Sequence, residues 1–497
     1  MAIADKAGTS GDAPRVQLRK QITLFHCVSI IVGIIIGSGI FVSPVGILQN
    51  VQSVGMSLLL WTVCGIFSTL CAICFAELGA CIPESGGEYM YIKRAFGDFL
   101  SFICLWINLV IIQPVGTAAS TLIFATYILR PVYPDCEPPK VAIRLIGVCV
   151  YAFLTAINVF NVKWATKVQA IITASKLSAL IMVIVIGLIW IVQGNTINFQ
   201  NPFANSDYSA GSVAIAFYSG FWAFGGWNYL NFLADEVIEP NRNLPSAILI
   251  SMAIVTVVYL VANVAYFAVL TPQEMLLSSA VAVTFAEQTV RPVVWIMPIL
   301  IAISVMGSMN GSMLSMSRLF FVGSRHNHLP EVISMISVRF STPAPSLIVM
   351  CILTITMQNF EEIFYLIEMM GFGFATVLTT TLAALIHLRW KEPDLKRPIK
   401  LPVVLPILLF FISISILVLT VYQKPQQSGL AILIIACGIP LYLFGTWRSK
   451  PASIQNILVK ITEFIQKLMY VAAEDDENSK TLNNDDVTKL LTENSPD

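Results

Sequence analysis

Two apolar segments, each long enough to cross a membrane, are interrupted at their centres by small residues that weaken helices. The first segment carries Gly37-Ser38-Gly39 and the sixth carries Gly225-Gly226. Lipid supplies no hydrogen-bond partners, so unwound backbone at mid-membrane is tolerated only where it is buried in protein or lines a cavity. One glycine pair alone would favour a packing notch between helices. Two breaks five spans apart favour a ligand site.

The ends of a broken helix suggest the chemistry of that ligand. Free N–H groups at a helix N-terminus bind anions, so the N–H groups of Ser38, Gly39 and Ile40 could bind a carboxylate. Free carbonyl groups at a C-terminal end accept hydrogen bonds from a cation. The candidate acceptors for an ammonium group are the carbonyl oxygens of Ile34, Ile35, Phe221 and Trp222. Together they fit a ligand that carries a carboxylate and an ammonium group on the same carbon, and no charged side chain is needed.

Lys176 is the clear charge within an apolar span, in Thr173-Ala174-Ser175-Lys176-Leu177-Ser178. An ionisable side chain in the membrane is costly unless it is paired or hydrated, so it is a candidate functional residue. A lysine that reaches the interface with its long side chain is the alternative. That alternative fits less well, because about ten residues separate Lys176 from either end of its span.

The composition sets the environment in which these residues act. Of the 497 residues, 56% are hydrophobic and 12% are charged, which is far too apolar for a soluble protein. The chain is therefore expected to be an all-α polytopic membrane protein. Runs of about 20 apolar residues predict twelve spans, of which the ninth is short: 28–50, 56–80, 99–128, 141–160, 166–192, 212–235, 246–270, 293–321, 345–358, 361–388, 402–421 and 429–447.

The distribution of lysine and arginine predicts the orientation in the membrane. With the N-terminus inside, the outer loops hold only Arg130, Lys140, Arg144, Arg291 and Lys424. Residues 1–20 are then a cytoplasmic tail, with no signal-peptide pattern. Residues 448–497 form a cytoplasmic end: an amphipathic helix at 452–472, lying on the membrane surface or on the protein's own loops, and then a disordered acidic tail.

Ten cysteines are present, and Cys136 differs from the others by its place. It lies in the predicted external loop between spans three and four, without a second external cysteine. In an oxidising compartment this indicates a disulfide to another chain, and an unpaired thiol is the equal alternative.

The remaining titratable residues favour no enzyme. Glu77 is expected to have a structural role, and Glu368 is expected to belong to the site or to face a water-filled vestibule. The four histidines lie near cytoplasmic ends of spans, so no metal site and no cofactor is predicted. A channel would need a filter loop or rings of charge, and nothing indicates binding of nucleic acid. Transport is therefore favoured over a channel, receptor or enzyme.

Long motifs along the chain resemble those of a known family, the L-type amino acid transporters, which are the catalytic light chains of heteromeric amino acid transporters. The resemblance runs from residue 16 to about 450. Its motifs are Gly33 to Phe41, Gly225 to Phe232, Arg242 to Pro245, Gly307 to Gly311, Ser317 to Phe320 and Arg397 to Lys400. It implies the inverted-repeat fold of the amino acid, polyamine and organocation superfamily, with 28–192 and 212–388 as the two repeats and 402–447 as two further spans.

The resemblance also implies roles for single residues. Cys136 would bond to a single-span glycoprotein heavy chain at the plasma membrane. The ammonium group of Lys176 would replace a sodium ion, so that transport is sodium-independent exchange. Trp222 would be an aromatic gate, and the uncharged Gly225 and Asn228 favour large neutral amino acids such as leucine, phenylalanine and methionine. Span ten around Phe372-Gly373-Phe374 departs from the mammalian pattern, so a range that includes lysine or arginine stays open.

Overall fold

The structure, a computed structural model, describes residues 22–472 except 83, 134–135, 161, 279, 291–293, 338–339, 341, 361 and 447–451. Within that range the side chains of 162–175, 235–236, 452–455 and 457–458 are not described. The tails predicted at 1–20 and 474–497 lie outside the described residues.

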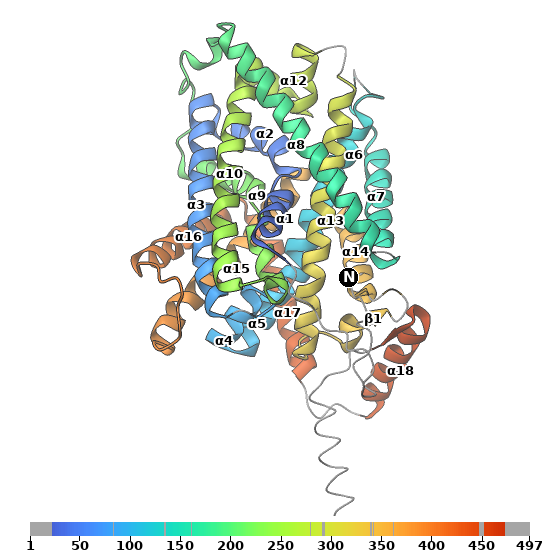
Figure 1. Ribbon diagram of the computed structural model, residues 1–497. Coiled ribbons are helices and arrows are strands. Elements are labelled where there is room, and N and C mark those ends of the chain that lie inside the picture. The colour runs from blue at the N-terminus through green and yellow to red at the C-terminus, as the bar shows by residue number, and fades with distance from the viewer. Residues whose placement is uncertain are drawn as a thin grey trace, which may run out of the picture.

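Helices make up nearly all of the described chain (Figure 1). The α-helices of the first half are α1 (Leu24–Ile35), α2 (Gly39–Val51), α3 (Val54–Cys81), α4 (Glu88–Phe96), α5 (Asp98–Ile107), α6 (Gln113–Leu129), α7 (Lys140–Phe160), α8 (Val162–Val192) and α9 (Ala210–Ala223). Those of the second half are α10 (Pro240–Val269), α11 (Pro272–Leu277), α12 (Val281–Thr289), α13 (Ile296–Arg325), α14 (Ala344–Met357), α15 (Ile363–Lys391), α16 (Val404–Gln423), α17 (Pro425–Thr446) and α18 (Ala452–Met469).

Shorter elements complete the chain. They are the π-helix η1 (Asn108–Ile112), the 3₁₀-helices η2 (Ile197–Phe199), η3 (Trp227–Glu236) and η5 (Glu331–Ser334), and the strands β1 (Ile336–Ser337) and β2 (Val471–Ala472).

Each predicted span contains a helix. Among the described residues, eight helices are long and apolar enough to cross a membrane, if α5, η1 and α6 count as one helix, Asp98–Leu129. Helices α1 and α2 form a ninth span that is bent by 47°. The other three predicted spans hold the shorter apolar helices Lys176–Val192, Ala210–Ala223 and Ala344–Met357. The chain is a multi-pass membrane protein.

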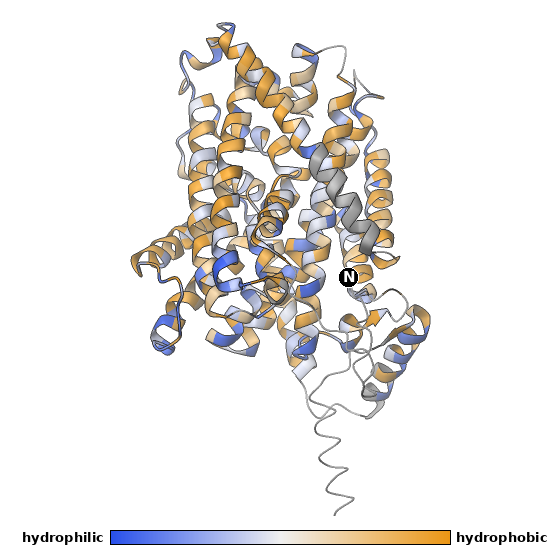
Figure 2. Cartoon of the chain, viewed as in Figure 1, coloured by the Kyte–Doolittle hydropathy of each residue, from blue (hydrophilic) through white to orange (hydrophobic). Residues whose placement is uncertain are grey.

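The outer surface of the bundle is apolar, as lipid requires. Phe153, Val257 and Phe411 are more than half exposed at 56%, 62% and 61%. Figure 2 shows hydrophobic residues along the outer helices, while hydrophilic ones gather toward their ends. Large exposed apolar side chains over such an area indicate contact with lipid rather than with water.

Helices α4 and α18 lie beside the bundle, at its lower end in Figure 1. The short helix α4 links the second and third spans and was not predicted. The helix expected at 452–472 is confirmed as α18, and β2 directly after it pairs antiparallel with β1, Ile336 opposite Ala472. The C-terminal segment therefore packs on the protein's own loop, while Phe464 and Leu468 of α18 remain exposed.

Candidate functional site

The two predicted breaks are present and lie against each other. Residues 36–38 separate α1 from α2, and 224–226 separate α9 from η3. A Cβ atom on Gly39 would lie 2.5 Å from the Cα atom of Ala223, and Gly226 has a left-handed φ of +117°. Gly39 is therefore both a packing notch and the first residue of α2. The two interpretations of the sequence, a packing notch and a ligand site, are compatible.

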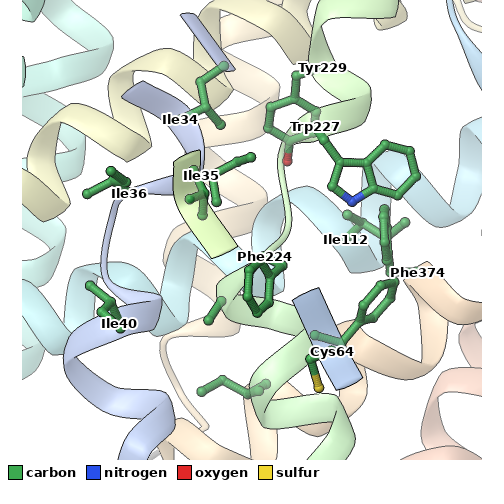
Figure 3. Close-up of a cluster of buried hydrophobic side chains, with 14 of the residues drawn as sticks. Ile34, Ile35, Ile36, Ile40, Cys64, Ile112, Phe224, Trp227, Tyr229 and Phe374 are labelled. Atoms are coloured by element: carbon green, nitrogen blue, oxygen red, sulfur yellow. The ribbon is translucent and has the colours of Figure 1, made fainter. Parts of the chain in front are cut away.

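Apolar side chains hold the two breaks together. A Cβ atom on Gly226 would lie 2.7 Å from Ile34 and 3.5 Å from Ile35, and Figure 3 shows these two side chains of the first span on the side of Tyr229 and Phe224 of the sixth. The second half of span six is the 3₁₀-helix η3, whereas span one resumes as an α-helix. The two broken spans thus differ in their second halves.

A cavity of about 90 Å³ lies between the breaks. This is small compared with the roughly 300–1,000 Å³ of sites for drug-sized ligands. Spans one, three, six, eight and ten contribute to its walls. Of the predicted site residues, the lining includes Ile34, Ile35, Ser38, Gly39, Phe221, Trp222, Gly225 and Asn228. Ile40 is not in the lining; its side chain is fully buried, so only its backbone N–H could serve the site.

The predicted carboxylate end is the N-terminus of α2. The first N–H groups of a helix have no partner within that helix, so they can bind an anion. The Ser38 hydroxyl, which is buried, lies 3.2 Å from that of Ser120 in α6. Ser120 also lines the cavity, which extends the polar edge of the site to span three.

The predicted ammonium end is partly engaged within the protein. The carbonyl oxygen of Ile35 accepts a hydrogen bond from the Tyr259 hydroxyl at 2.7 Å. Those of Phe221 and Trp222 accept the backbone N–H groups of Phe224 (3.2 Å) and Gly225 (3.0 Å). Each oxygen keeps a second lone pair. The Ile34 carbonyl oxygen accepts no hydrogen bond from the described residues, which makes it the most available of the four.

Lys176 is fully buried, and its Nζ atom donates a hydrogen bond to the carbonyl oxygen of Gly33. Gly33 lies in the last turn of α1, immediately before the first break. The ammonium group is not in the cavity lining. It bonds to the broken helix outside the cavity. Because the side chain is fully buried, it does not extend to a membrane interface.

Several polar residues of the site were not foreseen. Gln113, directly after the π-turn η1, lines the cavity with Ser308 and Ser312 of α13. π-turns inside helices often mark functional sites. The most consequential is Glu88, which is fully buried and accepts a hydrogen bond from the Asn228 amide at 3.2 Å. The only signal for it was Gly86-Gly87 ahead of α4, which marks a tight turn.

The other candidate carboxylates lie away from the cavity. Glu77 accepts hydrogen bonds from Arg389 at 2.6 and 3.2 Å and pairs with Arg397 at 3.4 Å, which confirms its structural role. Glu368 pairs with Lys424 at 3.1 Å and is not in the cavity lining. Cys136 is exposed. Among the described residues no three His, Cys, Asp or Glu side chains could hold a metal ion.

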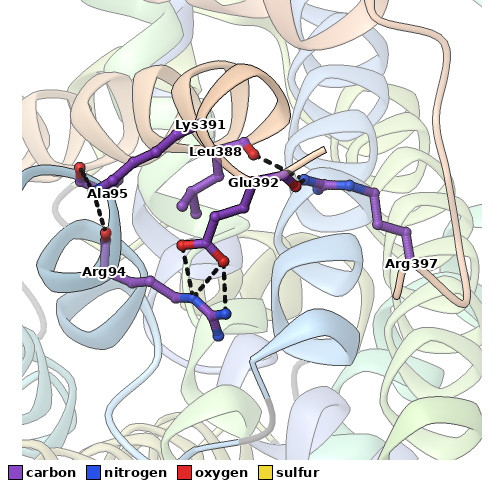
Figure 4. Close-up of polar contacts among 6 residues, drawn as sticks. All are labelled: Arg94, Ala95, Leu388, Lys391, Glu392 and Arg397. Atoms are coloured by element: carbon purple, nitrogen blue, oxygen red, sulfur yellow. Dashed lines mark hydrogen bonds and ion pairs between the residues drawn. The ribbon is translucent and has the colours of Figure 1, made fainter. Parts of the chain in front are cut away.

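Further polar contacts join α4 to the end of α15. Figure 4 shows Arg94 in a bidentate pair with Glu392, and Lys391 bonded to backbone oxygens of α4. Glu392 follows the last residue of α15. The helix that carries Glu88 is therefore fixed to a span that also lines the cavity.

Comparisons with known proteins agree with these features. The model of a family described as amino acid permease matches residues 22–444. The chain is 42% identical over 478 residues to the large neutral amino acids transporter small subunit 2 of Mus musculus, covering 95% of this chain and 90% of that protein. It is 43% identical over 463 residues to the cystine/glutamate transporter of Homo sapiens (93% and 92%). It is 40% identical over 473 residues to the Asc-type amino acid transporter 1 of Mus musculus (93% and 89%).

These relatives differ in the substrates that their names state, yet their identities to this chain are nearly equal. Overall identity therefore does not indicate which substrate this chain carries. That has to be inferred from the side chains around the cavity.

Proposed function

Because this chain belongs to the amino acid permease family, we propose that it is a sodium-independent exchanger of large neutral amino acids. The observation that carries the proposal is the cavity between two opposed helix breaks. Helix ends bind the carboxylate and ammonium groups that all amino acids share. Transport would proceed by alternating access around this fixed site.

The side chains around the cavity support neutral substrates. The described lining contains no charged residue, and its apolar members include Ile112, Trp222, Met309, Met370 and Phe374. A free anionic or cationic side chain would lose its hydration there without gaining a partner. Gly225 leaves room for a large side chain, because a Cβ atom there would meet only the backbone of Trp222.

Sodium independence rests on Lys176. Its ammonium group, when protonated, is an internal cation that donates a hydrogen bond to the Gly33 carbonyl oxygen, behind the first break. A bound sodium ion at such a place would stabilise the same carbonyl oxygens. We infer that Lys176 fills this role, so that each substrate leaves in exchange for another.

The assembly and membrane orientation are part of the same proposal. A relative at 42% identity is named a small subunit, and Cys136 is exposed between α6 and α7. We infer that Cys136 forms a disulfide with a single-span glycoprotein heavy chain at the plasma membrane, both termini of this chain being cytoplasmic. The opposed breaks suit two inverted repeats, 28–192 and 212–388.

Trans-stimulated efflux tests the transport function. Cells that co-express this chain with a heavy chain are loaded with labelled leucine in sodium-free medium, and leucine, lysine or glutamate is offered outside. We expect leucine to stimulate efflux and the other two not to. Equal stimulation by lysine would support the broader neutral and cationic range, for which Glu88 behind Asn228 could supply the negative charge. A requirement for sodium would contradict the role of Lys176.

A further inference from the structure

Glu88 lies directly behind one wall of the cavity. Gly86 and Gly87 have left-handed φ values of +119° and +51°, and they turn the chain so that α4 starts against η3. A Cβ atom on Gly87 would lie 2.8 Å from the ring of Phe232. This close approach places the fully buried Glu88 carboxyl group on the amide of Asn228, a residue of the cavity lining.

The hydrogen bond between them fixes which way the amide points. An ionised carboxylate only accepts hydrogen bonds, so the Asn228 amide must turn its NH₂ group toward Glu88. Its oxygen Oδ1 is then directed elsewhere, and this buried atom has no partner among the described residues. The same is true of the second carboxyl oxygen of Glu88, Oε2. One atom is thus available to accept from a ligand and the other to accept a proton.

No cation neutralises Glu88 within the part of the chain that the structure describes. Burial raises the pKa of its carboxyl group to about 7, although hydrogen bonds to backbone and to Asn228 oppose the shift. On the neighbouring helix α15, Lys391 bonds to the backbone oxygens of Arg94 and Ala95, and Arg389 bonds to Glu77. The side chains of Asp235 and Glu236 in η3 lie outside the description. The titratable side chains near Glu88 include Tyr91, Cys104 and Tyr229, none of which can carry a positive charge.

We propose that Glu88 is a proton-binding positioning residue, whose ionised form holds the oxygen of Asn228 toward the ammonium group of the substrate. The inference rests on the proposed amino acid site and adds a proton-linked step to it. When Glu88 is protonated, its O–H group can donate to the Asn228 oxygen, which the substrate then loses as an acceptor. Substrate binding and proton binding at Glu88 therefore oppose each other.

The sign of the pH dependence follows. The binding-competent form is the ionised one, and apparent affinity scales with its population. A group with a pKa of about 7 is roughly 90% ionised at pH 8 and roughly 10% ionised at pH 6. The dissociation constant for leucine should therefore rise about tenfold between pH 8 and pH 6.

Binding of labelled leucine to the purified full-length chain at pH 6, 7 and 8 tests this. We expect the tenfold change in the wild type and in Glu331→Gln, which alters an exposed carboxylate of η5. Glu88→Gln should keep a constant affinity within about twofold, and it also reports any titration of leucine itself. A wild-type affinity that does not change, or a Glu88→Gln variant that keeps the change, would overturn the inference without touching the exchange assay.

A second measurement needs no variant. At pH 7 in weak buffer, adding leucine to the wild-type protein should release protons, because binding favours ionised Glu88. Proton release should vanish at pH 9, where Glu88 is already ionised. Binding without proton release at pH 7 would also overturn the proposal.

Discussion

Gly39, in the first break, permits a close contact between the two broken spans that a larger residue would not. At Gly39 an added Cβ atom would press on the backbone of Ala223, which cannot move aside as a flexible side chain could. Overpacking of this kind typically costs about 1–3 kcal/mol. Gly39→Ala should push the N-terminus of α2 away from the cavity and lower leucine exchange per surface molecule about tenfold. Gly429→Ala in α17 is the control, because a Cβ atom there meets nothing within 4 Å; equal activity of the two variants would contradict the prediction.

Lys176 contributes a buried charge and a hydrogen bond in one side chain. Lys176→Met keeps the apolar stem but removes the bond to the Gly33 carbonyl. Hydrogen bonds to charged groups are worth roughly 1.5–3 kcal/mol, so exchange should fall about 10- to 100-fold. Leucine exchange in sodium-free medium measures it, with Lys460→Met on the exposed face of α18 as control. Unchanged exchange in Lys176→Met would remove Lys176 from the mechanism.

At the scale of elements, Glu77 ties three parts of the chain together. The carboxylate on α3 is fully buried and accepts from Arg389 of α15, from Arg397 and from the backbone N–H of Leu401 ahead of α16. Removing one partner of a buried ion pair typically costs about 3–5 kcal/mol, because the other charge stays buried and unpaired. Glu77→Gln should therefore lower the unfolding free energy by about 3 kcal/mol or more, measured by thermal unfolding in detergent.

The matched control is Glu392→Gln. Its carboxylate pairs with Arg94 at 2.7 Å, but both side chains are partly exposed, at 29% and 37%. Such pairs contribute about 0–1 kcal/mol. If both variants lost the same stability, burial of the Glu77 cluster would not be the cause.

The helix breaks could be predicted from the sequence because glycine and serine act locally: they weaken a helix wherever they stand within an apolar run. The same holds for the spans and for α18, whose patterns are local. Glu88 could not be predicted, because its burial depends on α4 folding back onto η3, residues more than a hundred positions away. Nor could the engaged carbonyl oxygens of Ile35, Phe221 and Trp222, since their donors are set by tertiary contacts and by how α9 ends.

At the scale of the whole molecule, the transport site and the proposed attachment to a heavy chain are separate. Cys136 is exposed in the loop between α6 and α7 and is not part of the cavity lining. Cys136→Ser should therefore abolish the disulfide-linked complex while leaving the site intact. On a non-reducing gel, the complex should be replaced by the free chain of 54.6 kDa. Leucine exchange, divided by the amount of protein at the surface, should change less than about twofold, because no cavity residue is altered.

Cys437→Ser is the control for that experiment. Cys437 is also exposed, but it lies within α17, a membrane-span candidate, where its thiol faces lipid rather than an oxidising aqueous compartment. The complex should survive this change. If it survived Cys136→Ser as well, the contact with the heavy chain would have to be non-covalent, and the exposed loop would lose its assigned role. If Cys136→Ser instead lowered exchange per surface molecule, the partner would act on the transport cycle itself, because a thiol outside the cavity can affect turnover only through the chain it joins.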